Sequence, residues 1–271
     1  MTNHGSIGTV EAGGAVRILN CIESEETEND WAFRHADEAG LLAVAPAAIP
    51  DSEDLRASWW TVGDQGATGS CVGWASADSV LRWHFVTSGR LPEDEPLSPR
   101  FQWMAAKETD QFVAQPTTFI ETAGTSLKAA LDIARKFGAV RNSILEFGSG
   151  ALYPGEVGTF YAIATQLKIN AYFNLGRRLR DWSHWLATNG PILTRLGVDE
   201  TWDQATDTGG SLDVYKPDTV RGGHAVALVG YTPDRFIVRN SWGPAWGDNG
   251  YAYASEAYAQ AAFTEAYGVT I

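Results

Sequence analysis

The stretch that decides the fold is DQGATGSCVGWA, residues 64–75, where a glycine-rich polar loop leads directly into an apolar segment at Cys71. Apolar residues then recur at about helical spacing as far as Phe85, and Ser70 is placed to cap this helix. In the first turn of a helix, unpaired N–H groups and the helix dipole lower a thiol pKa that is about 8.5 when free. The pattern makes Cys71 a candidate nucleophile, although a lone free cysteine is more often a small, buried and unreactive side chain.

Two stretches in the second half of the chain supply the groups that a thiol nucleophile needs. GGHAVALVGY, residues 222–231, carries His224, which lies 153 positions after the cysteine. NSWGPAWGDNGY, residues 240–251, begins with Asn240. The three stretches, in this order, resemble the papain-like cysteine peptidases, a family with about 130–150 residues between the catalytic cysteine and histidine.

The resemblance and the chemistry assign the same roles to four side chains. Cys71 attacks an amide or ester carbonyl as a thiolate and forms an acyl-enzyme. His224 pairs with the thiolate, protonates the leaving amine and then activates water. Asn240 orients the imidazole through its side-chain oxygen, while the Gln65 amide and the backbone N–H of Cys71 form an oxyanion hole.

Four further residues are candidates for binding the substrate. Alignment of AGTSLKAAL with the family's glycine-rich strip implies that Ala123 and Gly124 pair with the substrate backbone. Gly223, directly before the catalytic histidine, and Trp242 are the other two. Trp242 is also expected to shield the hydrogen bond of the imidazole from water. Gly223 stands where many relatives have Asp or Asn, so a different pH profile is expected.

Two positions around the cysteine depart from the typical motif. Thr68 stands where the family has a cysteine three residues before the nucleophile, and Val72 stands where it has a tryptophan directly after it. The first change removes a structural disulfide, which fits a reducing compartment. The second removes one wall near the cleft, for which the indole of Trp74 is a candidate substitute.

The order of the predicted elements indicates an α+β fold of two papain-like lobes with the active-site cleft between them. Residues 1–48 form an N-terminal extension with an acidic run, and are either a short pro-segment or a structural segment. Residues 49–271 form the catalytic domain. Helical patterns gather in a lobe of about 49–168, and five strand-like stretches follow in a β-rich lobe of about 169–271. Cys21 is an unreactive thiol, or contacts the cleft if the extension folds over it.

Composition excludes several partners. With 20 Lys+Arg against 33 Asp+Glu the chain carries a formal charge of −13, which argues against nucleic acids and anionic membranes. No apolar run approaches the about 20 residues that span a bilayer, and no signal-peptide pattern is present, so a cytoplasmic location is predicted. The other histidines have no ligand-like spacing, so neither a metal nor a cofactor is expected.

The predicted function is a thiol-dependent peptidase that acts on peptide or protein substrates. Two alternatives remain open on the sequence. One is an acyltransferase or amide-forming enzyme that passes the acyl group to an acceptor other than water, which the fold does not distinguish from a hydrolase. The other is a papain-fold binding module without turnover. The sequence does not indicate an oligomeric state.

Overall fold

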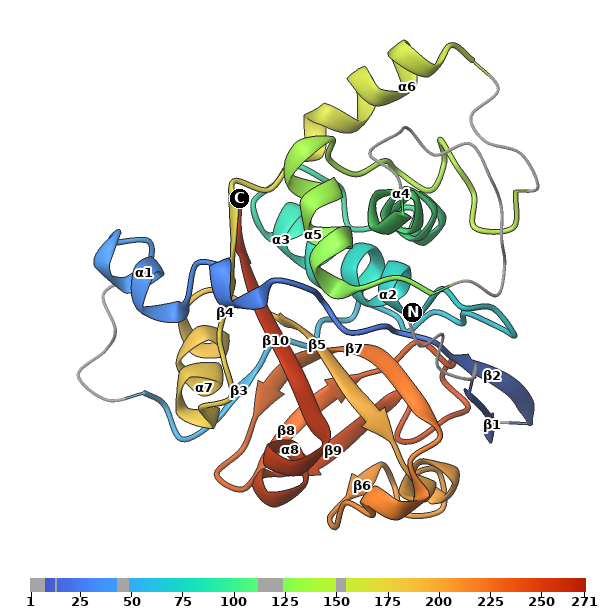
Figure 1. Ribbon diagram of the computed structural model, residues 1–271, viewed down its shortest axis with the longest axis vertical. Helices are drawn as coiled ribbons and strands as arrows, with labels where there is room; N and C mark the ends of the chain where they lie inside the picture. Colours follow the sequence, from blue (N-terminus) through green and yellow to red (C-terminus); the bar gives the residue numbers. More distant parts are fainter. Residues whose placement is uncertain (1–7, 13, 43–48, 112–123, 150–154) are drawn as a thin grey trace.

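The helix that begins at Cys71 lies between a group of helices and a large sheet (Figure 1). This computed structural model describes residues 8–12, 14–42, 49–111, 124–149 and 155–271. Helix α2 (Cys71–Gly73) continues through the π-helical stretch η2 (Trp74–Leu81) into α3 (Arg82–Thr87), so the predicted helix is confirmed. Its predicted cap differs, because the Ser70 side chain makes no capping hydrogen bond. The Ser70 hydroxyl lies 2.6 Å from the Thr68 hydroxyl instead.

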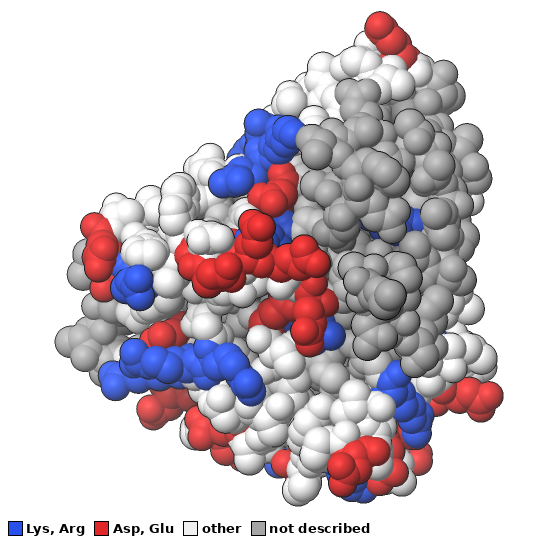
Figure 2. Space-filling model, in the orientation of Figure 1, with Lys and Arg blue, Asp and Glu red and all other residues white. Residues whose placement is uncertain are grey.

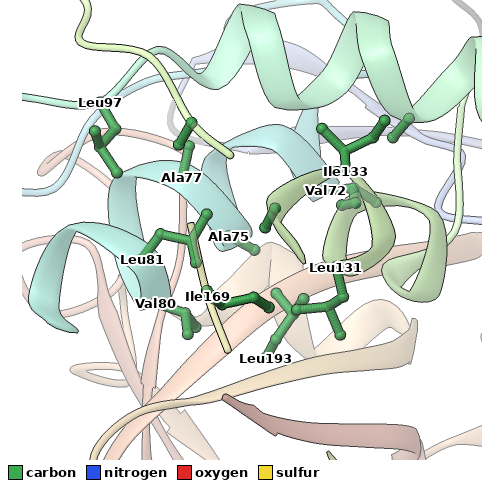
Figure 3. Packing of buried hydrophobic residues seen from close by; sticks show 14 of the residues in the cluster. Val72, Ala75, Ala77, Val80, Leu81, Leu97, Leu131, Ile133, Ile169 and Leu193 are labelled. Atoms are coloured by element: carbon green, nitrogen blue, oxygen red, sulfur yellow. The ribbon is translucent and has the colours of Figure 1, made fainter. Parts of the chain in front are cut away.

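Three further helices complete the helical side. They are α4 (Pro99–Gln111), α5 (Leu127–Lys136) and α6 (Val157–Ala164). Helix α5 begins where the sequence predicts, since the Ser126 hydroxyl accepts a hydrogen bond from the Ala129 N–H at 3.2 Å. Figure 3 shows the buried interface, in which Val72 and Ala75 of the first helix lie near Leu131 of α5 and Leu193 of the sheet. This apolar layer holds the Cys71 helix against the sheet.

The large sheet carries His224, and Asn240 directly follows one of its strands. Among the described residues its strand order is β4-β10-β5-β7-β8-β9-β6, with β3 paired to β7, and all pairs are antiparallel except β6 with β9. The strands are β3 (Glu53–Asp54), β4 (Ala171–Asn174), β5 (Ile192–Val198), β6 (Ser211–Leu212), β7 (Gly222–Tyr231), β8 (Arg235–Arg239), β9 (Tyr251–Ser255) and β10 (Phe263–Thr270). The five predicted strands are confirmed, whereas β10 is absent from the sequence analysis. The fold is α+β with two lobes.

The other face of the sheet has its own apolar cluster. Helices α7 (Leu179–Thr188) and α8 (Glu256–Ala262) cover it with buried aromatic side chains, among them Trp182, Trp185 and Tyr258. Short 3-10 turns lie elsewhere along the chain: η1 (Thr27–Asn29), η3 (Thr165–Leu167), η4 (Glu200–Gln204) and η5 (Pro217–Thr219). The sheet is thus buried on both faces.

The N-terminal extension is packed against the rest of the protein. Strands β1 (Gly8–Ala12) and β2 (Ala15–Leu19) form a hairpin, and helix α1 (Phe33–Glu38) follows. Side chains of all three elements are buried in the second apolar cluster. Between the hairpin and α1, the extension crosses the middle of the molecule in front of the sheet (Figure 1). It therefore contributes to the core of the fold as well as lying across its surface.

Candidate active site

His224 and Asn240 meet because β7 and β8 are neighbouring antiparallel strands. His224 lies near the start of β7, and Asn240 follows the last residue of β8. Their side chains are buried, with 2.8 Å between His224 Nε2 and Asn240 Oδ1. The indole of Trp242 packs against the imidazole, with ring centroids 4.9 Å apart, and is itself buried. This arrangement fixes the ring orientation and keeps water from the hydrogen bond.

The second ring nitrogen of His224 is the one that remains for chemistry. His224 Nδ1 is buried and has no hydrogen-bond partner among the described residues. Cys71, at the start of α2, receives a backbone hydrogen bond from Ala225, the residue that follows His224 on β7. The thiol therefore lies against the strand that carries the imidazole. Nε2 is held by the Asn240 amide oxygen, whereas Nδ1 has no partner among the described residues.

Gln65 is held in place from three directions. Its backbone N–H donates to Ser241 O at 2.8 Å, and the Ser241 hydroxyl donates to Gln65 Oε1 at 2.8 Å. One hydrogen of Gln65 Nε2 is donated to Thr68 O at 2.9 Å. The amide has a second hydrogen, which is the one that an oxyanion could accept. Ser241, which the sequence analysis did not single out, joins the Gln65 loop to the strand end that carries Asn240.

A buried ion pair ties the Cys71 helix to β8. Arg239 Nη2 lies 2.7 Å from Asp78 Oδ2, and both side chains are less than a tenth exposed. Arg239 Nη1 also donates to the Ser79 hydroxyl at 2.6 Å. Because Arg239 directly precedes Asn240, this pair positions the nucleophile's helix relative to the strand that orients the imidazole. The sequence offered no signal for it, since the partners are 161 positions apart.

The pKa of the Cys71 thiol is shifted in the direction opposite to the one that the sequence predicts, and the pKa of His224 is shifted as well. Burial raises the pKa of the Cys71 thiol to about 11, against partial compensation by backbone hydrogen bonds. Burial lowers the pKa of His224 to about 4, although its hydrogen bond to Asn240 acts in the other direction. The helix N-terminus was expected to favour the thiolate, but removal of water from both groups outweighs it. Burial thus shifts the pKa of each group toward its neutral form.

The N-terminal extension covers Cys71 and keeps solvent water away from the thiol. The Cys21 N–H donates to Gly223 O at 3.0 Å, and the Ile22 N–H donates to Thr125 O at 3.3 Å. The backbone of Asn20 hydrogen-bonds the Cys71 thiol. The extension thus runs between the two sides of the predicted cleft, over the nucleophile, and the alternative in which Cys21 contacts the cleft is the one that the structure supports.

Glycine is required where the extension approaches most closely. A Cβ on Gly124 would lie 1.7 Å from Asn20 O, and one on Gly223 would lie 2.2 Å from Cys21 O. Both predicted substrate-binding glycines therefore contact an extended backbone, which here belongs to the chain itself. Ala123, the fourth predicted substrate-binding residue, lies outside the described residues.

Arg17 of β2 is a further charged group that the sequence analysis missed. Its side chain is buried, forms an ion pair with Asp64, and donates from Nη2 to Trp242 O at 3.1 Å. Its positive charge also contributes to the lowered pKa of His224.

Trp74, the candidate wall of the cleft, packs against Phe147 with ring centroids 5.0 Å apart.

Two kinds of feature are absent from the described part of the chain. There, no group of three or more His, Cys, Asp or Glu side chains is arranged to hold a metal ion. Nor does any helix in the described ranges have the length and apolar character needed to cross a membrane.

Comparison with known proteins agrees with this geometry. A family model described as papain family cysteine protease matches residues 49–268. The chain belongs to the papain family of cysteine proteases. It is 28% identical over 223 residues to the cathepsin B-like protein CP3 of Giardia intestinalis, covering 77% of this chain and 70% of that one. It is 25% identical to cysteine proteinase B of Leishmania mexicana, of which it spans about half, 48%.

Solved structures of papain-family proteins share the fold. Xylellain, a cysteine protease from Xylella fastidiosa, superimposes with a TM-score of 0.76 at 20% identity, covering 97% of both chains. The cysteine protease CMS1MS2 of Carica candamarcensis, solved in complex with E-64, gives a TM-score of 0.59 at 20% identity and covers 82% of this chain. At these identities the likeness concerns the fold, and the family membership makes the protein a cysteine-type peptidase.

Proposed function

We propose that this peptidase hydrolyses peptide bonds through an acyl-enzyme on Cys71. The sulfur forms a bond to the carbonyl carbon while His224 Nδ1 takes the thiol proton and passes it to the leaving amine. Water, deprotonated by the same nitrogen, then releases the acid. Gln65 stabilises the oxyanion and Asn240 orients the ring. The observation that carries this proposal is the 2.8 Å contact from His224 Nε2 to Asn240 Oδ1, which leaves Nδ1 to the thiol.

The test is peptide hydrolysis by the purified chain and its Cys71→Ala variant, with Cys21→Ala as the matched control. We expect Cys71→Ala to abolish turnover and Cys21→Ala to retain it. Hydrolysis that survives in Cys71→Ala would contradict the proposal. Including a primary amine in the assay separates the acyltransferase alternative, which gives an amide product, from hydrolysis, which gives only the free acid. A chain without residues 1–48 that binds peptide and does not cleave it would support the binding-module alternative.

We also propose that the extension inhibits the peptidase by covering the nucleophile. Its support is the pair of hydrogen bonds from Cys21 and Ile22 to the two sides of the site, together with the contact of Asn20 with the thiol. A peptide cannot reach Cys71 while these bonds persist. The extension also buries apolar side chains such as Val10 and Leu19, so the pro-segment and structural alternatives are compatible.

A chain that starts at Ile49 tests both roles at once. Removal of the extension exposes apolar surface that is worth about 1.5–3 kcal/mol for each buried Val or Leu side chain, so the thermal midpoint should fall. If the extension inhibits, the surviving folded fraction should cleave peptides faster than the full chain. Lower stability without faster cleavage per folded molecule would leave the extension with a structural role alone.

We further propose a reducing compartment, the cytoplasm, as the location of the protein. No disulfide joins Cys21 and Cys71, and a thiol nucleophile requires its reduced form. Fractionation of cells that produce the protein, followed by thiol labelling, would test this.

A further inference from the structure

Arg195 of β5 lies beside the site and holds the extension. It pairs across the sheet with Ala225, next to His224. Its Nε donates to Cys21 O at 3.0 Å, and its Nη1 lies 3.3 Å from the carboxylate of Glu23. The Arg195 side chain is 13% exposed, whereas the Glu23 side chain is 76% exposed, so solvent reaches this ion pair from the Glu23 side. A guanidinium binds a carboxylate through charge-assisted hydrogen bonds, here with one partner open to water.

Lys128 faces the extension from the helical side. It follows the strip of Gly124 and Thr125 and lies in the first turn of α5. Its Nζ forms an ion pair with Asp30 at 2.8 Å and donates to the backbone oxygens of Glu25 and Glu26 at 3.1 and 3.0 Å. The two cations therefore approach the same segment from opposite lobes. Figure 2 shows acidic side chains gathered over the middle of the face, where the extension crosses in Figure 1.

The charge balance of this region depends on the extension. Within the described residues, the ion-pair partners of Arg195 and Lys128 are Glu23 and Asp30, which belong to the extension, and Glu265 of β10. Glu265 is the more distant partner of Arg195, at 4.0 Å. Without the extension, two cations would face one carboxylate. The wall of the site would then carry a local positive charge in a protein whose total is −13.

We propose that Arg195 and Lys128 are specificity-determining residues that make this peptidase prefer peptides with acidic side chains. A substrate that replaces the extension takes over the backbone partners at Gly223 and Thr125. Its carboxylates then take the places of Glu23 and Asp30. The acidic side chains of the extension thus occupy the positions that the acidic side chains of a substrate would take. The inference rests on the proposed peptidase function and on displacement of the extension from the site.

The test uses uncharged peptides that carry a single Glu, Gln or Lys at each position in turn around one scissile bond. The enzyme is the full-length chain, both unmodified and with Cys21→Pro, which removes the N–H that binds Gly223. At the position of Asp30, whose side chain is 4% exposed, a charge-assisted hydrogen bond predicts that Glu raises kcat/KM at least about tenfold over Gln. At the position of Glu23, whose side chain is 76% exposed, a smaller increase is expected. Raising the salt concentration should reduce this ratio.

Matched variants assign the preference to the two cations. Arg195→Gln and Lys128→Gln should each lower the Glu-to-Gln ratio, and together bring it to about one. Arg195→Lys should retain most of it, which guards against a mere folding defect. Lys136→Gln, at the other end of α5, is the control and should leave the ratio unchanged.

Three results would overturn the inference: equal rates for Glu and Gln peptides at every position, a preference for Lys, or an unchanged ratio in Arg195→Gln with Lys128→Gln. A preference for Lys would mean that the negative charge of Glu265 outweighs the positive charges of Arg195 and Lys128 at this side of the site. Failure of the proposed function looks different, because then no peptide in the set is cleaved, or Cys71→Ala cleaves them equally well.

Discussion

A single backbone hydrogen bond offers the sharpest test of how the extension controls the nucleophile. Cys21→Pro removes the N–H that donates to Gly223 O at 3.0 Å, whereas Cys21→Ser keeps it. Both variants remove the only other thiol in the chain, so any alkylation reports Cys71 alone. The comparison therefore isolates one contact of the extension and reads it at the buried sulfur.

The size of the effect follows from the open fraction of the extension. A buried backbone hydrogen bond contributes about 0.5–1.5 kcal/mol net, which multiplies the population of the open state roughly 2- to 13-fold when it is lost. The proline ring also occupies the space of the lost hydrogen, so this range is a lower bound. Because iodoacetamide reaches Cys71 only when the extension has moved, the alkylation rate should rise by the same factor in Cys21→Pro.

The assay is intact mass measured over time with excess iodoacetamide, on both variants, at several pH values. Because alkylation proceeds only from the open state, its rate in Cys21→Ser should be slow, and it should rise with pH as the exposed thiol ionises. Thermal unfolding of both variants separates local release from global unfolding. Equal alkylation rates in Cys21→Pro and Cys21→Ser would refute the reasoning.

Three further predictions concern the site and its titration. Asn240→Ala should lower kcat by about 10²-fold, because the His224 imidazole, which acts as the general base, loses the hydrogen bond that orients it. Stopped assays with a peptide substrate measure kcat. Gln65→Ala should lower kcat by about 10²–10³-fold with little change in KM, as expected for an oxyanion donor, and an unchanged kcat would remove Gln65 from the mechanism. Burial lowers the pKa of His84 and of His224 from 6.5 to about 4, so their contribution to stability is present in full above pH 6.5 and is lost as the pH falls toward 4. Urea unfolding should show this decline, by roughly 3 kcal/mol for each histidine, and His84→Gln should weaken it; a flat profile below pH 6.5 would contradict the burial argument.

The sequence by itself determined the fold class and the identity of the candidate catalytic groups. The reason is local: the glycine loop, the helical spacing after Cys71 and the strand patterns around His224 and Asn240 each lie within about a dozen residues. Strand β10 escaped detection because Phe263 follows the last residue of α8 directly, with no glycine or proline to mark the boundary.

Only the tertiary structure decided the state of the site. The contacts of Arg17 with Asp64 and Trp242, and of Cys21 with Gly223, join residues tens to hundreds of positions apart and leave no periodicity in the sequence. Burial, to which the extension contributes, raises the pKa of Cys71, because a thiol's ionisation depends on whether water reaches it as well as on the helix that carries it. The local pattern identifies the nucleophile, whereas long-range packing of the extension determines whether it is ionised and accessible.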